Sequence, residues 1–301
     1  MTVAGTPAVA TRVGRPFLGG RRFSLDWVGV LPFFAYVGIF LLLPTAVVGI
    51  GAFFNADGSF TLDNYAHLSR SYVFKATITT TLLSLVTALG GAFFGALLAY
   101  AIVTGNPNGM LRRLVVSASG VLAQFGGVTL AFAFIASIGS AGFVYLFAQS
   151  HGFDYYAHGI WLFELSGVAL VYLYFQIPLM VLVFLPALDG IKPQWREATE
   201  SLGGGTWHYW RYVAGPLLAP AFLGATLLLF ANAFSAYATV NALINQGQPV
   251  ISQQISGALS GEVGTFEPGF AKAIAVEMVI IVTAVTVLYS LLQRRTSRWL
   301  Q

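Results

Sequence analysis

Long apolar runs alternate with short polar stretches along the chain, and six of the runs are long enough to cross a bilayer. A helix needs about 20 apolar residues to cross the hydrocarbon core. We therefore predict six membrane-spanning helices, over residues 28–54, 74–103, 114–147, 164–188, 217–243 and 269–292. The third run is long enough for a tilted helix plus an interfacial extension. The pattern predicts an all-α integral membrane protein, with a domain over 28–292 between tails over 1–27 and 293–301.

Composition agrees with a lipid environment. Of the 301 residues, 57% are apolar and 9% are charged, whereas a soluble domain carries about 25% charged residues. The absence of cysteine excludes disulfides, thiolate chemistry and Cys-based metal sites. The histidines show no metal-ligand spacing, so we predict no metal site. The net charge of +4 is spread over the ends of the apolar runs and does not indicate a nucleic-acid partner.

Most basic residues gather on one side of the predicted spans. With a cytoplasmic N-terminus, twelve of the 15 Lys and Arg residues face the cytoplasm: Arg12, Arg15, Arg21, Arg22, Arg112, Arg113, Lys192, Arg196, Arg211, Arg294, Arg295 and Arg298. The outer side keeps Arg70, Lys75 and Lys272, and its loops carry Asp57, Asp63, Asp154, Glu262 and Glu267. Because cytoplasmic loops of membrane proteins are enriched in Lys and Arg, we predict that both termini and the loop 189–216 are cytoplasmic.

The loop 189–216 contains local signals for two short helices. Pro193 suits a first helical position, and glycines at 203–205 end the first helix. Thr206 is a plausible N-cap for a second segment, which Gly215-Pro216 would break. Arg196 and Glu200 are four residues apart and are expected to pair. The loop is predicted to be a projecting helix–turn–helix, although its aromatic residues also suit an amphipathic loop lying on the membrane.

The residues of this loop carry a family resemblance. Glu197, Ala198, Gly203 and Pro216 have the spacing of the EAA loop in permease subunits of binding-protein-dependent ABC importers, with Thr199, Val213 and Gly215 replacing the family's Ala, Ile and Leu. The resemblance implies the type I ABC importer permease fold. It also implies that the loop docks in a groove of a separate ATPase subunit, through Glu197, Ala198, Glu200, Leu202, Gly203, Trp207 and Pro216.

The chain lacks the G-x-x-x-x-G-K-[ST] loop that would cradle ATP phosphates. We therefore expect a non-catalytic subunit without a cofactor of its own, and ATP and magnesium in a partner. The resemblance implies a second permease, two ATP-binding subunits and an extracytoplasmic substrate-binding protein as partners, in the bacterial cytoplasmic membrane.

A second stretch narrows the resemblance. Residues 230–239, followed by 253–257, are similar to the branch of permeases for polyamines, ferric iron and phosphonate, especially the spermidine/putrescine type. The resemblance implies a polyamine or a similar small charged compound as solute. A permease for sugar or glycerol phosphate in the same superfamily is the alternative.

Polar groups inside predicted spans are candidates for the solute path, because such groups are costly in lipid. They are Gln124 in the third span, Gln176 in the fourth, Asn232 and Tyr237 in the fifth, and Glu277 in the sixth. Glu277 has an alternative interpretation as a charge that is protonated or paired locally with Lys272. Gln124 and Asn232 also suit hydrogen bonds between helices.

Two other classes of protein fit the sequence less well. A secondary transporter driven by an ion gradient would favour inverted repeats and broken helices with ion ligands at mid-membrane, and the sequence shows no clear repeat. A membrane-embedded enzyme would need clustered His, Asp or Ser groups at membrane depth, and none cluster in the sequence.

Overall fold

The computed structural model describes residues 26–55, 57–106, 109–157, 159–244, 249–260 and 267–297. The chain divides into two compact units, Met1–Val47 and Val48–Gln301. In the first unit, α1 (Asp26–Val37) continues through a π-helical turn, η1 (Gly38–Leu42), into α2 (Leu43–Gly51), whose last residues belong to the second unit. Gly29–Gly51 is apolar enough to cross a membrane, so the expected first span is confirmed, ending at Gly51 rather than 54.

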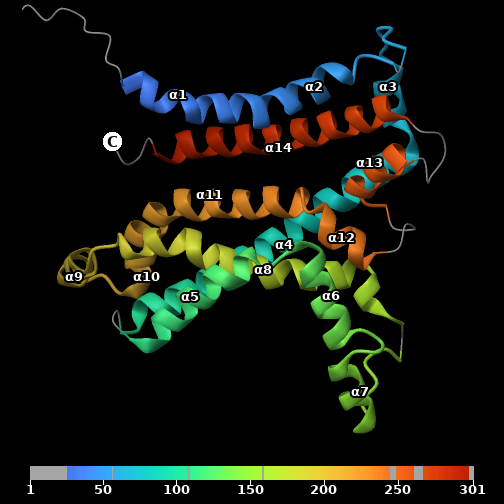
Figure 1. Cartoon of the computed structure of the whole chain (residues 1–301). Coiled ribbons are helices and arrows are strands. Elements are labelled where there is room, and N and C mark those ends of the chain that lie inside the picture. Colours follow the sequence, from blue (N-terminus) through green and yellow to red (C-terminus); the bar gives the residue numbers. More distant parts are fainter. Residues whose placement is uncertain are drawn as a thin grey trace, which may run out of the picture. The chain divides into compact units, whose positions relative to one another are not determined.

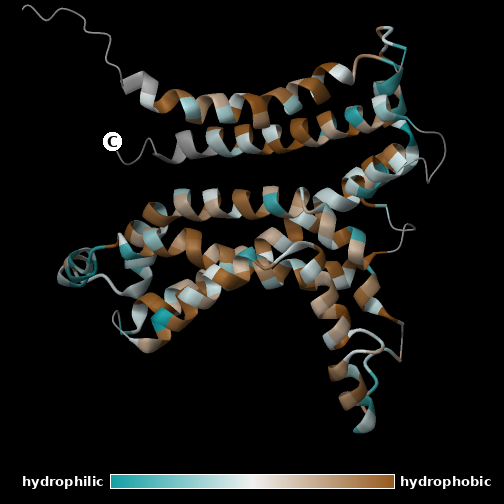
Figure 2. Cartoon of the chain, in the orientation of Figure 1, coloured by the Kyte–Doolittle hydropathy of each residue, from teal (hydrophilic) through white to brown (hydrophobic). Residues whose placement is uncertain are grey.

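Long helices form the centre of the second unit (Figure 1). They are α4 (Ser71–Thr104), α8 (Leu165–Asp189), α11 (Gly215–Phe234) and α14 (Pro268–Ser297). The predicted spans 74–103, 164–188 and 269–292 lie within α4, α8 and α14 to within a residue or two, and α14 continues for several residues beyond the predicted end. The apolar colouring of these helices contrasts with the hydrophilic segment around α9 (Pro193–Ser201) (Figure 2).

Small residues allow α4 and α8 to pack closely. Gly91, Gly95 and Ala99 lie four residues apart and are all buried. A Cβ atom on Gly95 would lie 2.5 Å from Cβ of Met180 and 2.7 Å from the carbonyl oxygen of Ile177, both on α8. Since small residues let helix backbones approach in a membrane, this stripe explains why α4 and α8 share the main core cluster with α11.

The predicted third span, 114–147, consists of three helices rather than one tilted helix with an interfacial extension. That run contains α5 (Met110–Gln124), α6 (Gly127–Ile138) and α7 (Phe143–Ser150). The break between α5 and α6 occurs where Gly127 has φ of +69°, a conformation that L side chains rarely adopt. The segment apolar and long enough to cross a membrane is Gly127–Ser150, and α6 turns away from α5 (Figure 1).

Short helices occupy the connections on the side away from α9 (Figure 1). They are α3 (Asp63–Ala66), η2 (His67–Ser69), η3 (Trp161–Phe163), α12 (Tyr237–Leu243) and α13 (Ile251–Ser260). The predicted fifth span, 217–243, is therefore wrong at its end, because α11 stops at Phe234 and α12 is a separate helix.

Ion pairs fix which loops share an end of the second unit. Arg112, at the start of α5, lies 2.6 Å from Asp189 at the end of α8. At the other end, Glu267 lies 3.8 Å from Arg70 and 3.6 Å from His67. The basic start of α5 and the loop 189–216 therefore lie together, and the acidic residue Glu267 lies on the opposite side, as the charge pattern predicts.

Candidate functional site

The predicted projecting loop is a helix–turn–helix in which glycine conformation determines the turn. Helix α9 (Pro193–Ser201) begins at Pro193, as predicted. It ends with backbone hydrogen bonds from Gly203 N–H to the Glu200 carbonyl and from Gly204 N–H to the Thr199 carbonyl, each 2.9 Å. Gly203 has φ of +80°. This Schellman-type helix ending requires a left-handed backbone conformation, which glycine adopts without strain.

The second helix of the loop differs from the prediction. Gly205, not Thr206, is its N-cap, and α10 (Thr206–Tyr209) passes through a π-helical turn, η4 (Trp210–Ala214), into α11 without a break at Gly215-Pro216. Thr206–Phe234 is thus a single helix of 29 residues. The Gly215 N–H donates to the Trp210 carbonyl in a π-type bond, and a Cβ atom on Gly215 would collide with that same oxygen. The wider turn explains why glycine occupies this position.

The predicted docking residues are exposed at this end of the unit. Glu197, Ala198 and Glu200 are exposed on α9, and Arg196 Nε lies 3.1 Å from Glu200 Oε1, which confirms the expected pair. Leu202 is 89% exposed and Trp207 is 73% exposed, although both are large apolar residues. Ala198, Leu202 and Pro216 help to line a hollow of about 360 Å³ between α9 and the start of α11. Apolar side chains on a projecting turn are typical of a contact surface for another protein.

Glu277 is the candidate carboxylate on α14. Its Oε1 accepts a hydrogen bond from Thr77 Oγ1 on α4 at 3.0 Å. Its Oε2 is buried and has no hydrogen-bond partner among the described residues. Lys272 lies against Gly51, and the described part of the chain contains no ion pair between Lys272 and Glu277. The local pairing expected as an alternative is therefore not observed.

Gln176 is 0% exposed and lies in the contact between α4 and α8. Its Nε2 donates to Thr87 Oγ1 at 3.3 Å, while its Oε1 is buried without a hydrogen bond among the described residues. A Cβ atom on Gly91 would lie 2.7 Å from Cβ of Gln176. Gln176 thus joins the two helices, and a role in the solute path stays a prediction.

The remaining candidates lie apart from one another. Gln124, at the end of α5, and Asn232, on α11, are exposed, and neither makes a side-chain hydrogen bond to another described residue. Tyr237 belongs to α12 rather than to the fifth span, and its hydroxyl donates to Ser256 Oγ on α13 at 2.9 Å. The structure therefore does not assemble the five candidates into one site.

Sequence reasoning missed a hollow lined by hydroxyl groups around Tyr237. It has a volume of about 300 Å³ and is lined by Ser235, Tyr237, Ser252 and Ser256, with Ile255, Leu259 and Met278 as apolar walls. Ser235 follows α11, whereas Ser252 and Ser256 lie on α13, and the fold brings these separate elements together. No group of three or more His, Asp or Glu residues suited to a metal ion occurs within the described ranges.

The helical spans and their arrangement define an integral membrane protein with the type I ABC importer permease fold. A permease in the crystal structure of a bacterial ABC transporter involved in the import of the acidic polysaccharide alginate superimposes with a TM-score of 0.72 at 19% identity, covering 90% of this chain and 95% of that one. A chain of the MetNI methionine ABC transporter, in an inward-facing conformation, gives a TM-score of 0.53 at 16% identity, covering 76% and 99%.

The chain belongs to the family of binding-protein-dependent transport system inner membrane components, whose model matches residues 143–298. It is thus a multi-pass inner membrane protein. It is 27% identical to the thiamine transport system permease protein ThiP of Haemophilus influenzae over 184 residues, 61% of this chain and 32% of ThiP. It is 24% identical to a putative ferric transport system permease protein, FbpB 1, of the same organism, covering 74% and 34%.

A third relative is the probable sulfate transport system permease protein cysT of Chlorokybus atmophyticus. The two are 24% identical over 210 residues, which is 68% of each chain. The chain spans about a third of the thiamine and ferric permeases. The chain therefore shares a family with these three relatives, which are named for three different solutes: thiamine, ferric iron and sulfate.

Proposed function

We propose that this chain is a transmembrane permease subunit of an ATP-driven importer. It moves a small solute across the cytoplasmic membrane by alternating access, and both its termini face the cytoplasm. It pairs with a second permease and two ATP-binding subunits, which hydrolyse magnesium-bound ATP. An extracytoplasmic binding protein delivers the solute to the opposite side of the membrane.

The observation that carries this proposal is the exposed turn between α9 and α10. Leu202 and Trp207 lie on either side of Gly203 and are largely exposed, so the turn presents apolar surface outside the helix bundle. The second of its helices continues directly into a membrane span. A partner that binds and moves this turn would therefore move α11 with it, which is what coupling to an ATPase requires.

We further propose that the solute is a small cation, with a polyamine as the first candidate. Glu277 places an acidic group inside α14, with one buried carboxylate oxygen that lacks a hydrogen-bond partner among the described residues. The acidic residues Asp57, Asp63 and Asp154 belong to connections expected on the outer side. The named relatives for thiamine and ferric transport are consistent with a cation, whereas the sulfate permease is not.

The first experiment is affinity purification of the tagged chain from membranes of its own cell in a mild detergent. Recovery of an ATPase, a second permease and a binding protein would support the importer, and the ligand of that binding protein would identify the solute. A bound sugar or glycerol phosphate would replace the polyamine. Recovery of the chain alone, with transport that continues without any ATPase, would favour a secondary transporter instead.

A further inference from the structure

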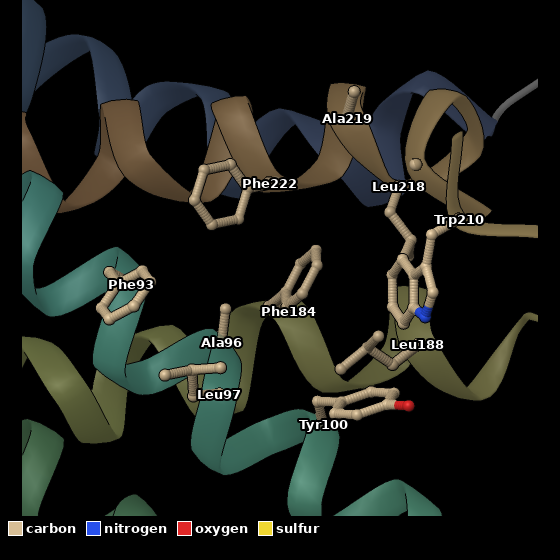
Figure 3. Close-up of a pocket in the computed structure, with 11 residues that line it drawn as sticks. Phe93, Ala96, Leu97, Tyr100, Phe184, Leu188, Trp210, Leu218, Ala219 and Phe222 are labelled. Atoms are coloured by element: carbon tan, nitrogen blue, oxygen red, sulfur yellow. The ribbon is translucent and has the colours of Figure 1, made fainter. Parts of the chain in front are cut away.

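A groove with apolar walls lies between α4, α8 and the η4–α11 segment, close to the α9–α10 turn. Its volume is about 490 Å³. Phe184, Leu188 and Leu218 form a buried floor. Phe93 and Leu97 line the same space from α4, and all these side chains point toward it (Figure 3).

One end of the groove is bounded by two amphipathic aromatic rings. Tyr100 and Trp210 meet edge to face, with ring centroids 5.3 Å apart. They supply the polar side-chain atoms among the lining residues, a phenol oxygen and an indole nitrogen (Figure 3). Trp and Tyr are enriched where the hydrocarbon core of a bilayer meets its headgroups. The groove thus extends from the interface on the side of the α9–α10 turn toward the hydrocarbon core.

The position and chemistry of the groove select its ligand. Every wall belongs to a helix that is long and apolar enough to cross a membrane, so the groove lies at the depth of the bilayer. Its volume lies in the range of about 300–1,000 Å³ that small-molecule sites occupy. Arg211 is exposed and follows Trp210 in the chain, and basic residues at a membrane surface attract anionic headgroups.

We propose that this groove binds one acyl chain of an anionic phospholipid from the bilayer leaflet on the side of the α9–α10 turn. The acyl chain lies on Phe184 and Leu188, and the headgroup lies beside Arg211. Because Trp210 belongs to the π-helical turn that joins the projecting loop to α11, the lipid contacts the connection between them. This inference stands whether or not the chain is an importer subunit.

The test compares variants in which the groove is filled. Ala96 and Ala219 line it from α4 and α11, so Ala96→Phe and Ala219→Phe narrow it from opposite sides. Ala101→Phe makes the same change at an exposed position of α4 that does not line the groove. The purified chain is analysed by native mass spectrometry after extraction from membranes that contain phosphatidylglycerol and phosphatidylethanolamine.

We expect the unmodified chain and Ala101→Phe to retain one phospholipid, and both filled variants to lose it. The fluorescence of Trp210 is obtained as the difference between each chain and the same chain carrying Trp210→Phe. In vesicles of phosphatidylglycerol with mid-chain bromine atoms, this Trp210 fluorescence should be quenched less in the filled variants than in the unmodified chain. Equal lipid retention by all variants would overturn the proposal, as would equal quenching in the filled and unmodified chains. Arg211→Gln should lose the preference for phosphatidylglycerol, and an unchanged preference would overturn the headgroup assignment.

Discussion

The α4–α8 contact and the α9–α10 turn both depend on glycine, for different physical reasons. Gly95 has ordinary helical backbone angles, but a Cβ atom there would overlap Met180. Gly203 has open space around it and a φ of +80°. The first glycine is required by its neighbours and the second by its own backbone. A side chain would therefore disturb helix packing at Gly95, whereas at Gly203 it would change only the direction of the chain.

The largest effect is expected from Gly95→Val. Overpacking a close contact costs about 1–3 kcal/mol or more, and the carbonyl oxygen of Ile177 cannot move away as a flexible side chain can. We expect the yield of folded protein from membranes to fall sharply, as measured by size-exclusion chromatography in detergent. Gly120→Val is the control, because no heavy atom lies within 4 Å of its added Cβ atom. A normal yield of Gly95→Val would show that α4 and α8 do not need this approach.

Gly203→Asp should leave the protein folded and inserted but reduce uptake by about 5- to 150-fold, the range of typical coupling energies between sites. A left-handed backbone is strained by about 1–2 kcal/mol in residues with a side chain, so the turn would change its direction. Uptake and ATPase co-purification are measured together. Gly205→Asp is the matched control, since Gly205 has φ of −90° and open space around it. Normal uptake by Gly203→Asp would contradict the coupling role.

Gly215→Leu restores the residue of the EAA pattern and is expected to disturb the π-helical turn. The new Cβ atom would collide with the Trp210 carbonyl, so the helix should convert to a regular α-helix and turn α10 relative to α11. Uptake should fall less than in Gly203→Asp. The fluorescence emission contributed by Trp210, obtained by comparison with Trp210→Phe, should shift in wavelength. Gly120→Leu serves as the control in a helix with open space. An unchanged spectrum with full uptake would show that the π turn is dispensable.

Glu277→Gln should have the smallest effect. It tests whether a charge inside the helix bundle contributes to uptake of the solute. Glutamine can still accept the hydrogen bond from Thr77, so folding and subunit association should be unaffected. Loss of the charge should reduce uptake of a cation by roughly two- to fivefold, corresponding to about 0.5–1 kcal/mol. Glu164→Gln, an exposed carboxylate before α8, is the control. Unchanged uptake would leave Glu277 as a structural partner of Thr77.

The sequence predicts the spans better than the breaks within them. Apolar length locates α4, α8 and α14 because each is a single uninterrupted helix. It fails over 114–147, where three helices follow one another and only the glycines at 126, 127, 139 and 142 mark the breaks. It also fails at Gly215-Pro216, because the π-type hydrogen bond from the Gly215 N–H to the Trp210 carbonyl keeps the helix continuous up to the proline.

For the candidate site, local residues are predictable and distant contacts are not. The Arg196–Glu200 pair and the turn at Gly203 depend on neighbours in the sequence, and the structure contains both. The contact of Thr77 with Glu277 joins residues 200 positions apart, and no pattern within either segment indicates it. The apolar run continues past Phe234 and therefore predicts a span that includes Tyr237, whereas the Tyr237 hydroxyl lies beside Ser256 on a separate helix.

The continuous helix Thr206–Phe234 gives the molecule a mechanical lever. At about 1.5 Å per residue, its 29 residues extend roughly 44 Å. Trp207 lies at one end, on the exposed turn, and Ser235, which lines the hydroxyl hollow, directly follows the other end. A tilt of about 4° around the first end displaces the second by about 3 Å, comparable to the length of a hydrogen bond. A small rotation at the turn is therefore enough to make or break polar contacts on the far side of the membrane.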